Sequence, residues 1–396
     1  MAEAGKCHLW LFMGNWFRSF PLNFWLMSLG SLFFFLSFNM ILPELPDALR
    51  AAGGAAYIGY ILPAFAFSAL IARPLSGWVT DRLGRKAAMI GGAMFCVVAG
   101  IFYPLANTIT LFFLIRFVHG FSTGFSPTGF TAFTTDVVPE KRRAEALGWQ
   151  GIFSNSGTAL GYAVGSLLVL YMGEKSLYWG SSLLALLAIV IFMQLPETKP
   201  EATEQRSGSI FYWKSWPPAL LMLLVCIPLG TLLTILPDYT LQKGYQNKGI
   251  FLTVYIGSSL LVRVFSGKLS DRMGRSLSIA IGSGFQIIAL LMLLFDYGFF
   301  LSAILYGIGQ GFNAPSLFAW AGDLSTKETR GRSLSMLFMA LETGIIIGGW
   351  GAGHLFTHCQ LGYNQIFGCC AIASILCCAF ALGFAHKKSL HRQASS

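Results

Sequence analysis

Apolar residues along this chain gather in long blocks, and short polar segments separate one block from the next. Twelve blocks approach the roughly 20 helical residues that are needed to cross a hydrocarbon layer about 30 Å thick. A segment in lipid must satisfy its own backbone hydrogen bonds, which limits it to a helix or a closed barrel. Barrel strands alternate polar and apolar residues, and these blocks do not. The pattern therefore predicts an all-α membrane protein with twelve transmembrane helices.

The predicted helices cover the ranges 22–42, 57–78, 87–105, 111–134, 144–170, 177–193, 219–236, 250–269, 278–294, 299–317, 333–356 and 366–384. The first block is too long for a signal peptide and lacks a small-residue cleavage site, so we expect it to remain as a helix. The aromatic segment 10–20 before it has the composition of a helix on the membrane surface, although a tail without fixed structure fits as well.

Charge is scarce and lies on one side of the predicted membrane. Only 11% of the residues are charged, whereas a soluble domain has about 25%. With successive loops on alternate sides, 20 of the 27 Lys and Arg residues fall on one side, three fall within helices, and four fall on the other side: Arg50, Lys175, Lys243 and Lys248. The positive-inside rule places the basic side, with both termini, in the cytoplasm. The net charge of +10 therefore reflects topology, and no nucleic-acid partner is expected.

The sequence repeats itself once. Residues 72–85 (ARPLSGWVTDRLGR) and 262–275 (VRVFSGKLSDRMGR) share seven identical positions at an offset of 190. The fifth and eleventh predicted helices also match, with Gly157 and Gly161 corresponding to Gly344 and Gly348. We predict two pseudo-symmetric six-helix bundles, 1–194 and 219–396, joined by a polar cytoplasmic linker, 195–218. Repeats of this kind place a cavity between the halves near the middle of the membrane.

The loop that starts at Gly77 (GWVTDRLGRK) resembles the signature between helices 2 and 3 of the major facilitator superfamily. Its copy starts at Gly267, between helices 8 and 9, where that family repeats it. The resemblance covers essentially the whole chain and implies the major facilitator fold and alternating access. It also implies that the loops gate the cytoplasmic side, although a packing and topology role stays open. Gly77 is expected to allow close helix packing, and Asp81 to face a helix N-terminus and pair with a basic residue. The implied gating residues are Gly77, Asp81, Arg82, Arg85, Gly267, Asp271, Arg272 and Arg275.

Charged residues inside the predicted helices are candidates for proton coupling. Arg116 begins the stretch RFVHG, which resembles the R-x-x-Q-G motif of proton-driven members, with His119 in place of glutamine. An arginine within a membrane helix normally finds a carboxylate or water. Glu44 or Asp238, at the outer ends of helices 1 and 7, is the expected partner of Arg116. His119 either titrates near neutral pH or packs through a hydrogen bond.

Glu342 lies ten residues inside its predicted helix, which is about 15 Å at 1.5 Å per residue. An unpaired carboxylate near the midplane is expected to be protonated, so it can carry a proton from one side to the other. A hydrogen bond across helices is the alternative. Arg73 and Arg263 are related by the repeat and are assigned to the inner gate, with attraction of an anionic substrate as the alternative.

Polar and aromatic residues of the helices around the expected cavity are candidates for substrate binding: Asn39, Phe125, Trp149, Gln150, Asn155, Gln310, Asn313 and Trp320. His354, His358 and Cys359 lie close in sequence but lack an evident third partner for a metal site. Neither a phosphate-binding Walker loop nor a catalytic constellation stands out. We therefore expect no metal, no cofactor and no enzymatic activity.

The glycines of the fifth helix resemble the glycine-rich antiporter motif of the twelve-helix drug:proton antiporter branch, although Gly157-Thr158 replaces that motif's Gly-Pro step. Glycines at this spacing also simply let helices approach. The first expectation is a monomeric, proton-coupled exporter of small organic compounds in a bacterial inner membrane. A proton-coupled symporter that imports a small solute stays open because the Gly-Pro step is missing. A transport-inactive membrane sensor or scaffold is the third reading, and the gating loops in both halves argue against it.

Overall fold

The computed structural model describes residues 20–198, 212–326 and 329–393, and these residues are almost entirely helical. The aromatic segment up to residue 19 and most of the predicted linker lie outside the described residues. The long helices are α2 (Leu22–Met40), α4 (Ile61–Arg82), α5 (Arg85–Phe102), α6 (Ile109–Val137), α7 (Arg143–Met172), α8 (Glu174–Gln194), α9 (Trp216–Gln242), α10 (Ile250–Met273), α11 (Arg275–Leu294), α12 (Phe299–Asp323), α13 (Arg330–Thr357) and α14 (Tyr363–Gln393). The short ones are η1 (Leu42–Glu44), α3 (Leu45–Ala51), η2 (Ala55–Tyr60), η3 (Tyr103–Leu105), η4 (Glu140–Arg142) and η5 (Trp213–Ser215).

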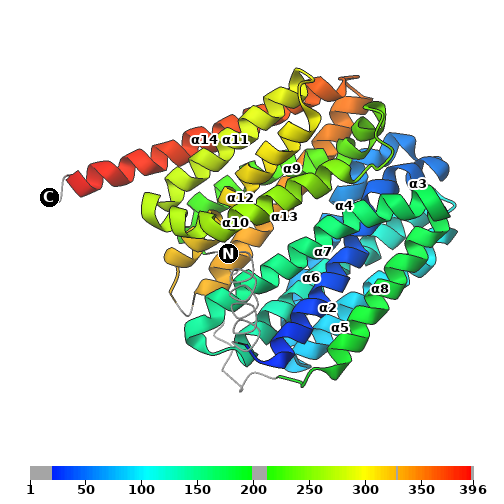
Figure 1. The fold of residues 1–396 in the computed structure, drawn as a ribbon, viewed down its shortest axis with the longest axis horizontal. Helices are drawn as coiled ribbons and strands as arrows, with labels where there is room; N and C mark the ends of the chain where they lie inside the picture. Colours follow the sequence, from blue (N-terminus) through cyan, green and yellow to red (C-terminus); the bar gives the residue numbers. More distant parts are fainter. Residues whose placement is uncertain (1–19, 199–211, 327–328, 394–396) are drawn as a thin grey trace, which may run out of the picture.

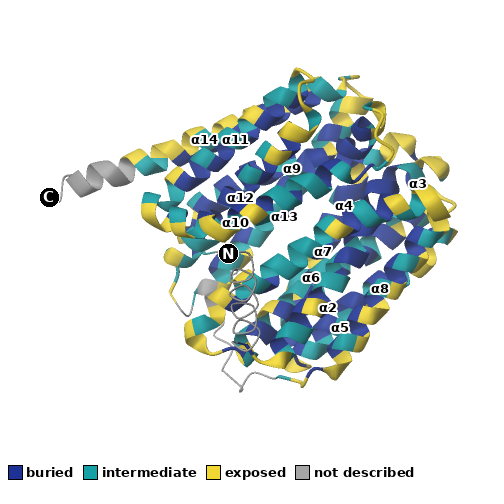
Figure 2. Cartoon of the chain, in the orientation of Figure 1, coloured by how far each residue is buried: buried dark blue, intermediate teal, exposed yellow. Residues whose placement is uncertain are grey.

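Each of the twelve predicted helices corresponds to one long helix, which confirms the predicted fold class. Eleven of the described helices are long and apolar enough to cross a membrane. The remaining long helix, α12, has 25 residues but is less apolar because it carries Gln310, Asn313 and several glycines. Many large hydrophobic side chains are exposed, among them Leu261 and Val264. Exposed segments occur along the helices of both bundles (Figure 2). This distribution suits a protein surrounded by lipid rather than by water.

The helices form two bundles that lie side by side (Figure 1). Helices α2 to α8 pack with one another, and helices α9 to α14 pack with one another. The bundles meet mainly where α4 packs on α13 and where α7 packs on α10. These two pairs are equivalent under the internal repeat, since α4 corresponds to α10 and α13 corresponds to α7. The predicted pseudo-symmetry is therefore present in the packing.

The two ends of the bundles differ in how the halves are joined. We call them the Glu44 end and the Asp81 end after residues that lie there. At the Glu44 end, one hydrophobic cluster contains buried residues of both halves, such as Leu45 and Leu236. At the Asp81 end, each half has its own cluster, one around Phe130 and the other around Leu317. In the part of the chain that the structure describes, an apolar cluster therefore joins the two halves at the Glu44 end and not at the Asp81 end.

Glycines make the seal at the Glu44 end very close. A Cβ atom on Gly59 would lie 2.5 Å from the Cα atom of Gly353, so η2 and α13 touch through their backbones. A Cβ atom on Gly349 would lie 3.1 Å from the Cδ atom of Pro63 in α4. In the equivalent place, Gly249 faces the carbonyl of Tyr162 in α7. Larger side chains here would push the two halves apart.

Candidate functional site

Arg73 of α4 and Glu342 of α13 form an ion pair that joins the two halves. The distance from Arg73 Nη2 to Glu342 Oε1 is 2.8 Å. The guanidinium also lies over the ring of Phe338, 4.6 Å from its centroid. The Glu342 side chain is 9% exposed and the Arg73 side chain 21% exposed, so the pair is largely withdrawn from water. The sequence placed these two residues in different classes, gate and proton carrier, and the structure brings them together.

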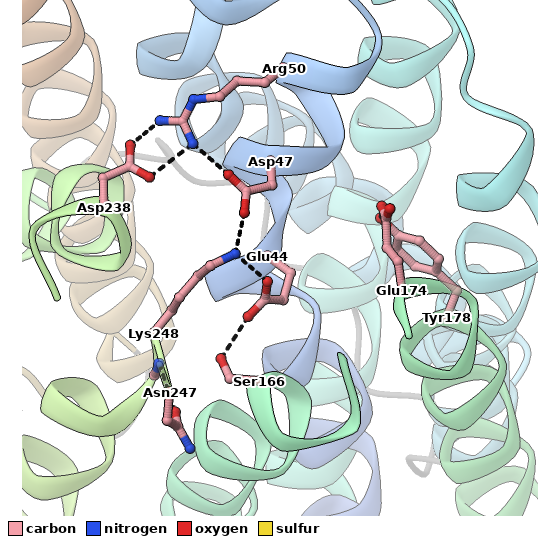
Figure 3. Close-up of polar contacts among 10 residues, drawn as sticks. Glu44, Asp47, Arg50, Ser166, Glu174, Tyr178, Asp238, Asn247 and Lys248 are labelled. Atoms are coloured by element: carbon pink, nitrogen blue, oxygen red, sulfur yellow. Dashed lines mark hydrogen bonds and ion pairs between the residues drawn. The ribbon is translucent and has the colours of Figure 1, made fainter. Parts of the chain in front are cut away.

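A second set of charges joins the halves at the Glu44 end, and we call it the Glu44 network (Figure 3). Its members are Glu44, Asp47, Arg50, Ser166, Asp238 and Lys248. Arg50 of α3 binds the Asp238 carboxylate with both terminal nitrogens, and its Nη1 lies 3.0 Å from Asp238 Oδ1. Lys248, just before α10, binds both Glu44 and Asp47. Ser166 of α7 donates a hydrogen bond to Glu44, with a distance of 2.7 Å.

The Glu44 network keeps Lys248 charged. Burial alone would lower the pKa of Lys248, but attraction to Glu44 and hydrogen bonds to Asp47 and Glu44 outweigh it and raise this pKa above its ordinary value. The network crosses the boundary between the halves twice, at Arg50–Asp238 and at Lys248 with its two carboxylates. It therefore closes the Glu44 end electrostatically, above the apolar seal.

The expected pairing of Arg116 with Glu44 or Asp238 is wrong for this conformation. Both carboxylates belong to the Glu44 network. Arg116 is fully buried, donates from Nε to the carbonyl of Ile61 over 3.2 Å, and lies over the ring of Phe65, 4.2 Å from its centroid. Its two terminal nitrogens are buried without a hydrogen-bond partner among the described residues.

His119 has the surroundings of a packing residue. It is fully buried, and its ring meets those of Phe38 and Phe65 edge-on. Its Nδ1 atom lies 3.4 Å from the hydroxyl of Tyr103. Its Nε2 atom is buried and has no hydrogen-bond partner among the described residues.

The two repeated loops have the same geometry in both halves. Gly84 and Gly274 carry φ angles of +110° and +95°, a region that favours glycine because other residues would place Cβ too close to the backbone. Each glycine directly precedes an arginine that binds two carboxylates. Arg85 reaches Asp136 at 2.8 Å and Asp81 at 3.4 Å. Arg275 reaches Asp323 at 2.9 Å and also binds Asp271.

The remaining gating residues contact little in this conformation. Each ion pair described at the Asp81 end joins residues of the same half. Arg82 lies 5.6 Å from the ring centroid of Trp78, and Arg272 is exposed. The expected close packing at Gly77 is wrong here, because a Cβ atom on Gly77 or Gly267 would meet nothing within 4 Å. Among the described residues, the ion pairs of this end hold each half together and none of them joins the two halves.

Close packing occurs instead at the glycines of α7 and α13. A Cβ atom on Gly161 would lie 2.8 Å from the Leu36 carbonyl of α2, and one on Gly344 would lie 2.6 Å from the Leu223 carbonyl of α9. Gly157 and Gly348 approach α2 and α9 in the same way. The structure therefore supports the packing interpretation of these glycines within each half.

Most of the predicted cavity residues form their hydrogen bonds or ring contacts with residues of the same half. Asn39 donates to Thr158, Gln150 accepts from Thr134, and Asn313 donates to Gln286. Trp149 packs against Trp25, Trp320 against Phe384, and Phe125 against Phe95. Gln310 is buried in the second half, and its amide nitrogen has no hydrogen-bond partner among the described residues. Asn155 is half-buried on α7, the helix that contacts α10, and its amide donates a hydrogen bond to the Gly151 carbonyl of its own helix.

Five charged residues were not among the predicted site residues. Asp47, Arg50 and Lys248 complete the Glu44 network, and Asp136 and Asp323 complete the repeated loops. Asp136 and Asp323 occupy equivalent positions at the ends of α6 and α12, so the repeat itself was a usable signal. Lys248 and Glu44 are 204 positions apart, and no local spacing could have joined them.

Comparison with known proteins agrees with this architecture. The family model for the Major Facilitator Superfamily matches residues 27–295 and again residues 219–396. Multidrug resistance protein 1 of Bacillus subtilis is 30% identical over 182 residues, which cover 44% of this chain and 46% of that protein. The chain thus matches less than half the length of this relative. Quinolone resistance protein NorA of Staphylococcus aureus is 24% identical over 278 residues, covering 67% of this chain and 71% of NorA.

Solved structures show the same fold at lower identity. The nucleoside transporter NupG (D323A mutant) superposes with a TM-score of 0.74 at 17% identity, covering 91% of this chain and 99% of NupG. The human organic anion transporter MFSD10 (TETRAN) superposes with a TM-score of 0.70 at 18% identity, covering 91% and 100%. The twelve helices, the repeated loops and the family match lead to one conclusion. This chain belongs to the major facilitator superfamily and is a membrane transporter rather than an enzyme.

Proposed function

We propose that this transporter is a proton-coupled secondary carrier that exports small organic compounds by alternating access. The observation that carries the proposal is the Arg73–Glu342 ion pair between the two halves. A proton on Glu342 would remove the negative charge that holds Arg73, so protonation would loosen a contact that joins α4 to α13. One titratable group thereby links proton binding to movement of the halves.

The proposed orientation places the Asp81 end in the cytoplasm, in line with the positive-inside rule. In that orientation, the described structure is closed toward the outside by the Glu44 network and the glycine seal. At the cytoplasmic end, the ion pairs and apolar clusters of the described residues lie within one half or the other, so substrate would enter from the cytoplasm. The reverse state would need the Glu44 network to separate and the repeated loops to pack between the halves.

Export is favoured by the similarity to Multidrug resistance protein 1 and to the quinolone resistance protein NorA. Their names state resistance to many drugs and to quinolones, and export of such compounds from the cell is one way to produce resistance. The identities of 30% and 24% support the class of compound, small and organic, without specifying one.

The proposal is tested by transport in proteoliposomes with an imposed pH gradient and a panel of fluorescent organic compounds. Wild type should carry at least one compound against its gradient when protons flow the other way. Glu342→Gln should retain exchange of the compound but lose its dependence on the pH gradient. Glu174→Gln is the matched control, because Glu174 accepts its hydrogen bond from Tyr178 within α8, away from the boundary between the halves. An equal response to the pH gradient in wild type and Glu342→Gln would reject the role of Glu342.

The direction of flux in the same vesicles separates export from import. Movement of compound and protons in the same direction would favour a symporter that imports a solute. Absence of flux for the whole panel, with the protein folded and bound compounds detected, would favour a membrane sensor. The paired gating loops argue for a carrier, since a sensor has no need of two equivalent gates.

A further inference from the structure

The ion pair between Arg73 and Glu342 has an incomplete counterpart in the other half of the interface. Arg263 of α10 corresponds to Arg73 under the repeat offset of 190. On α7, the residue that corresponds to Glu342 of α13 is Asn155, because each of them lies two positions before the matching glycines Gly157 and Gly344. The helices correspond as well, because α10 packs on α7 as α4 packs on α13. The second site therefore keeps its arginine and lacks its acid.

Arg263 has no ionic partner among the described residues. None of the ion pairs found there includes it, and its Nε atom is buried without a hydrogen-bond partner. Asn155 does not compensate, since its amide donates to the Gly151 carbonyl of its own helix at 2.7 Å. Glu342 is the only acidic residue in the middle of a transmembrane helix in this sequence, and Arg73 already holds it.

An uncompensated guanidinium at this depth is costly and normally marks a pathway for a charged group. Arg116 is also without a carboxylate, but it is fully buried beneath the closed Glu44 end. Arg263 is half-buried and lies toward the Asp81 end, where the two halves have separate cores. Because no apolar cluster joins the halves at the Asp81 end among the described residues, we expect a solute that enters from that end to meet Arg263.

We infer that Arg263 binds a carboxylate group of the transported compound, in the place that corresponds to the Glu342 carboxylate opposite Arg73. The guanidinium fork presents two parallel N–H groups that match a carboxylate in a bidentate geometry. The inference rests on the proposed transport of small organic compounds and specifies their class: molecules with an apolar body and one carboxylate.

The test compares two fluorescent compounds that differ only in that group, rhodamine B and its ethyl ester. Binding is measured by fluorescence anisotropy on protein in nanodiscs of neutral phosphatidylcholine. Wild type should bind rhodamine B about tenfold more tightly than the ester, which is the scale of a charge-assisted hydrogen-bonded pair. Arg263→Gln should bring the ratio of the two affinities, rhodamine B to ester, close to one. Arg263→Lys should keep part of the preference, because lysine keeps the positive charge but not the two parallel N–H groups. Lys268→Gln, an equal loss of charge on an exposed residue of the same helix, should keep the wild-type ratio.

A second variant tests the geometry without removing the arginine. Asn155→Asp restores an acid at the position that corresponds to Glu342, so it should pair with Arg263 and abolish the preference for rhodamine B. A wild-type ratio near one, or a ratio that survives in Arg263→Gln, would overturn the inference. So would loss of the preference when phosphatidylglycerol is added, because a lipid headgroup would then be the anion that Arg263 binds.

The two proposals fail in different ways. If both dyes are carried in a proton-dependent manner with equal affinity, the proposed function stands and the carboxylate site is rejected. If rhodamine B is preferred through Arg263 but flux ignores the pH gradient, the carboxylate site stands and proton coupling is rejected.

Discussion

Gly59 and Gly353 bring the backbones of the two bundles into direct contact, because neither carries a side chain that would hold them apart. This contact, from η2 to α13, closes the Glu44 end together with the charges of the Glu44 network. A seal made of backbone is sensitive to a single added methyl group, which makes it a direct test of the closed state.

Gly353→Ala should open the Glu44 end. The new Cβ atom would overlap Gly59. Overpacking of this kind costs about 1–3 kcal/mol, which lowers the ratio of closed to open molecules by about 5-fold to about 150-fold. Distances between spin labels placed across the Glu44 end would measure the shift. Gly351→Ala is the control on the same helix, since its Cβ atom would meet nothing within 4 Å. Equal label distances in both variants would contradict the seal.

Replacing the two members of the Arg73–Glu342 pair should have unequal effects on stability. Glu342→Gln leaves a guanidinium that stays charged, whereas Arg73→Gln leaves a carboxyl group that can take up a proton and become neutral. Because the Arg73 side chain is 21% exposed, the cost of Glu342→Gln is expected at about 1–3 kcal/mol, below that of a fully buried pair. Thermal unfolding in detergent at neutral pH would measure it. A larger loss for Arg73→Gln than for Glu342→Gln would contradict this account.

Lys248 should hold the Glu44 end closed over a wide pH range. Because its pKa is raised in the closed state, its ammonium contributes fully below the ordinary value of about 10.4, and this contribution is lost only as pH rises through the raised pKa. Spin-label distances should therefore stay constant between about pH 6 and 9. Lys248→Gln should widen the Glu44 end throughout that range.

Lys243→Gln is the matched control for Lys248. Lys243 also binds a carboxylate near this end of the molecule, but its partner, Asp296, belongs to the same half. Its removal should leave the label distances unchanged. Equal widening in the two lysine variants would show that net charge, rather than the bridge between halves, sets the closure.

Two glycines of the second repeated loop should respond to alanine in opposite directions. Gly274 has a φ of +95°, so Gly274→Ala should cost about 1–2 kcal/mol. Gly267 is helical with open space around its Cα atom, so Gly267→Ala should stabilise this conformation by about 0.5–1 kcal/mol. Thermal unfolding would compare them. Slower transport in Gly267→Ala despite greater stability would assign this glycine to the opposite state of the gate.

The number and order of the helices could be predicted because the thickness of the bilayer requires an apolar block of about 20 residues for each spanning helix. An apolar block of sufficient length specifies a spanning helix whatever its neighbours are. The turn at Gly84 and Gly274 could also be expected, since the repeated glycine marks a conformation that other residues avoid. The helix ends were less accurate, because α9 continues to Gln242, past Pro237 and its neighbouring aspartate, where apolar content stops.

The partners of the charged residues could not be predicted, because they depend on which faces of distant helices meet. Arg73 and Glu342 are 269 positions apart, and Arg50 and Asp238 are 188 apart. Arg116 illustrates the same limit. Proximity to the outer end suggested Glu44 or Asp238 as its partner, but Lys248 binds Glu44 and Arg50 binds Asp238. Sequence identified the chemical groups and their depth, and only packing decided their pairing.

The second half carries both an arginine and a glutamate at the contact between the halves, whereas the first half carries an arginine and an asparagine. A protein made by duplicating one half would therefore depend on which half was duplicated. A tandem of two second halves would carry an arginine on each α10 copy and a glutamate on each α13 copy, so both crossings could be neutralised. A tandem of two first halves would carry two arginines from α4 copies and two asparagines from α7 copies, leaving two positive charges in lipid with no acid at their depth. In the present chain, Glu342 neutralises the arginine where α4 meets α13. Where α10 meets α7, Arg263 is left for the carboxylate of a bound compound.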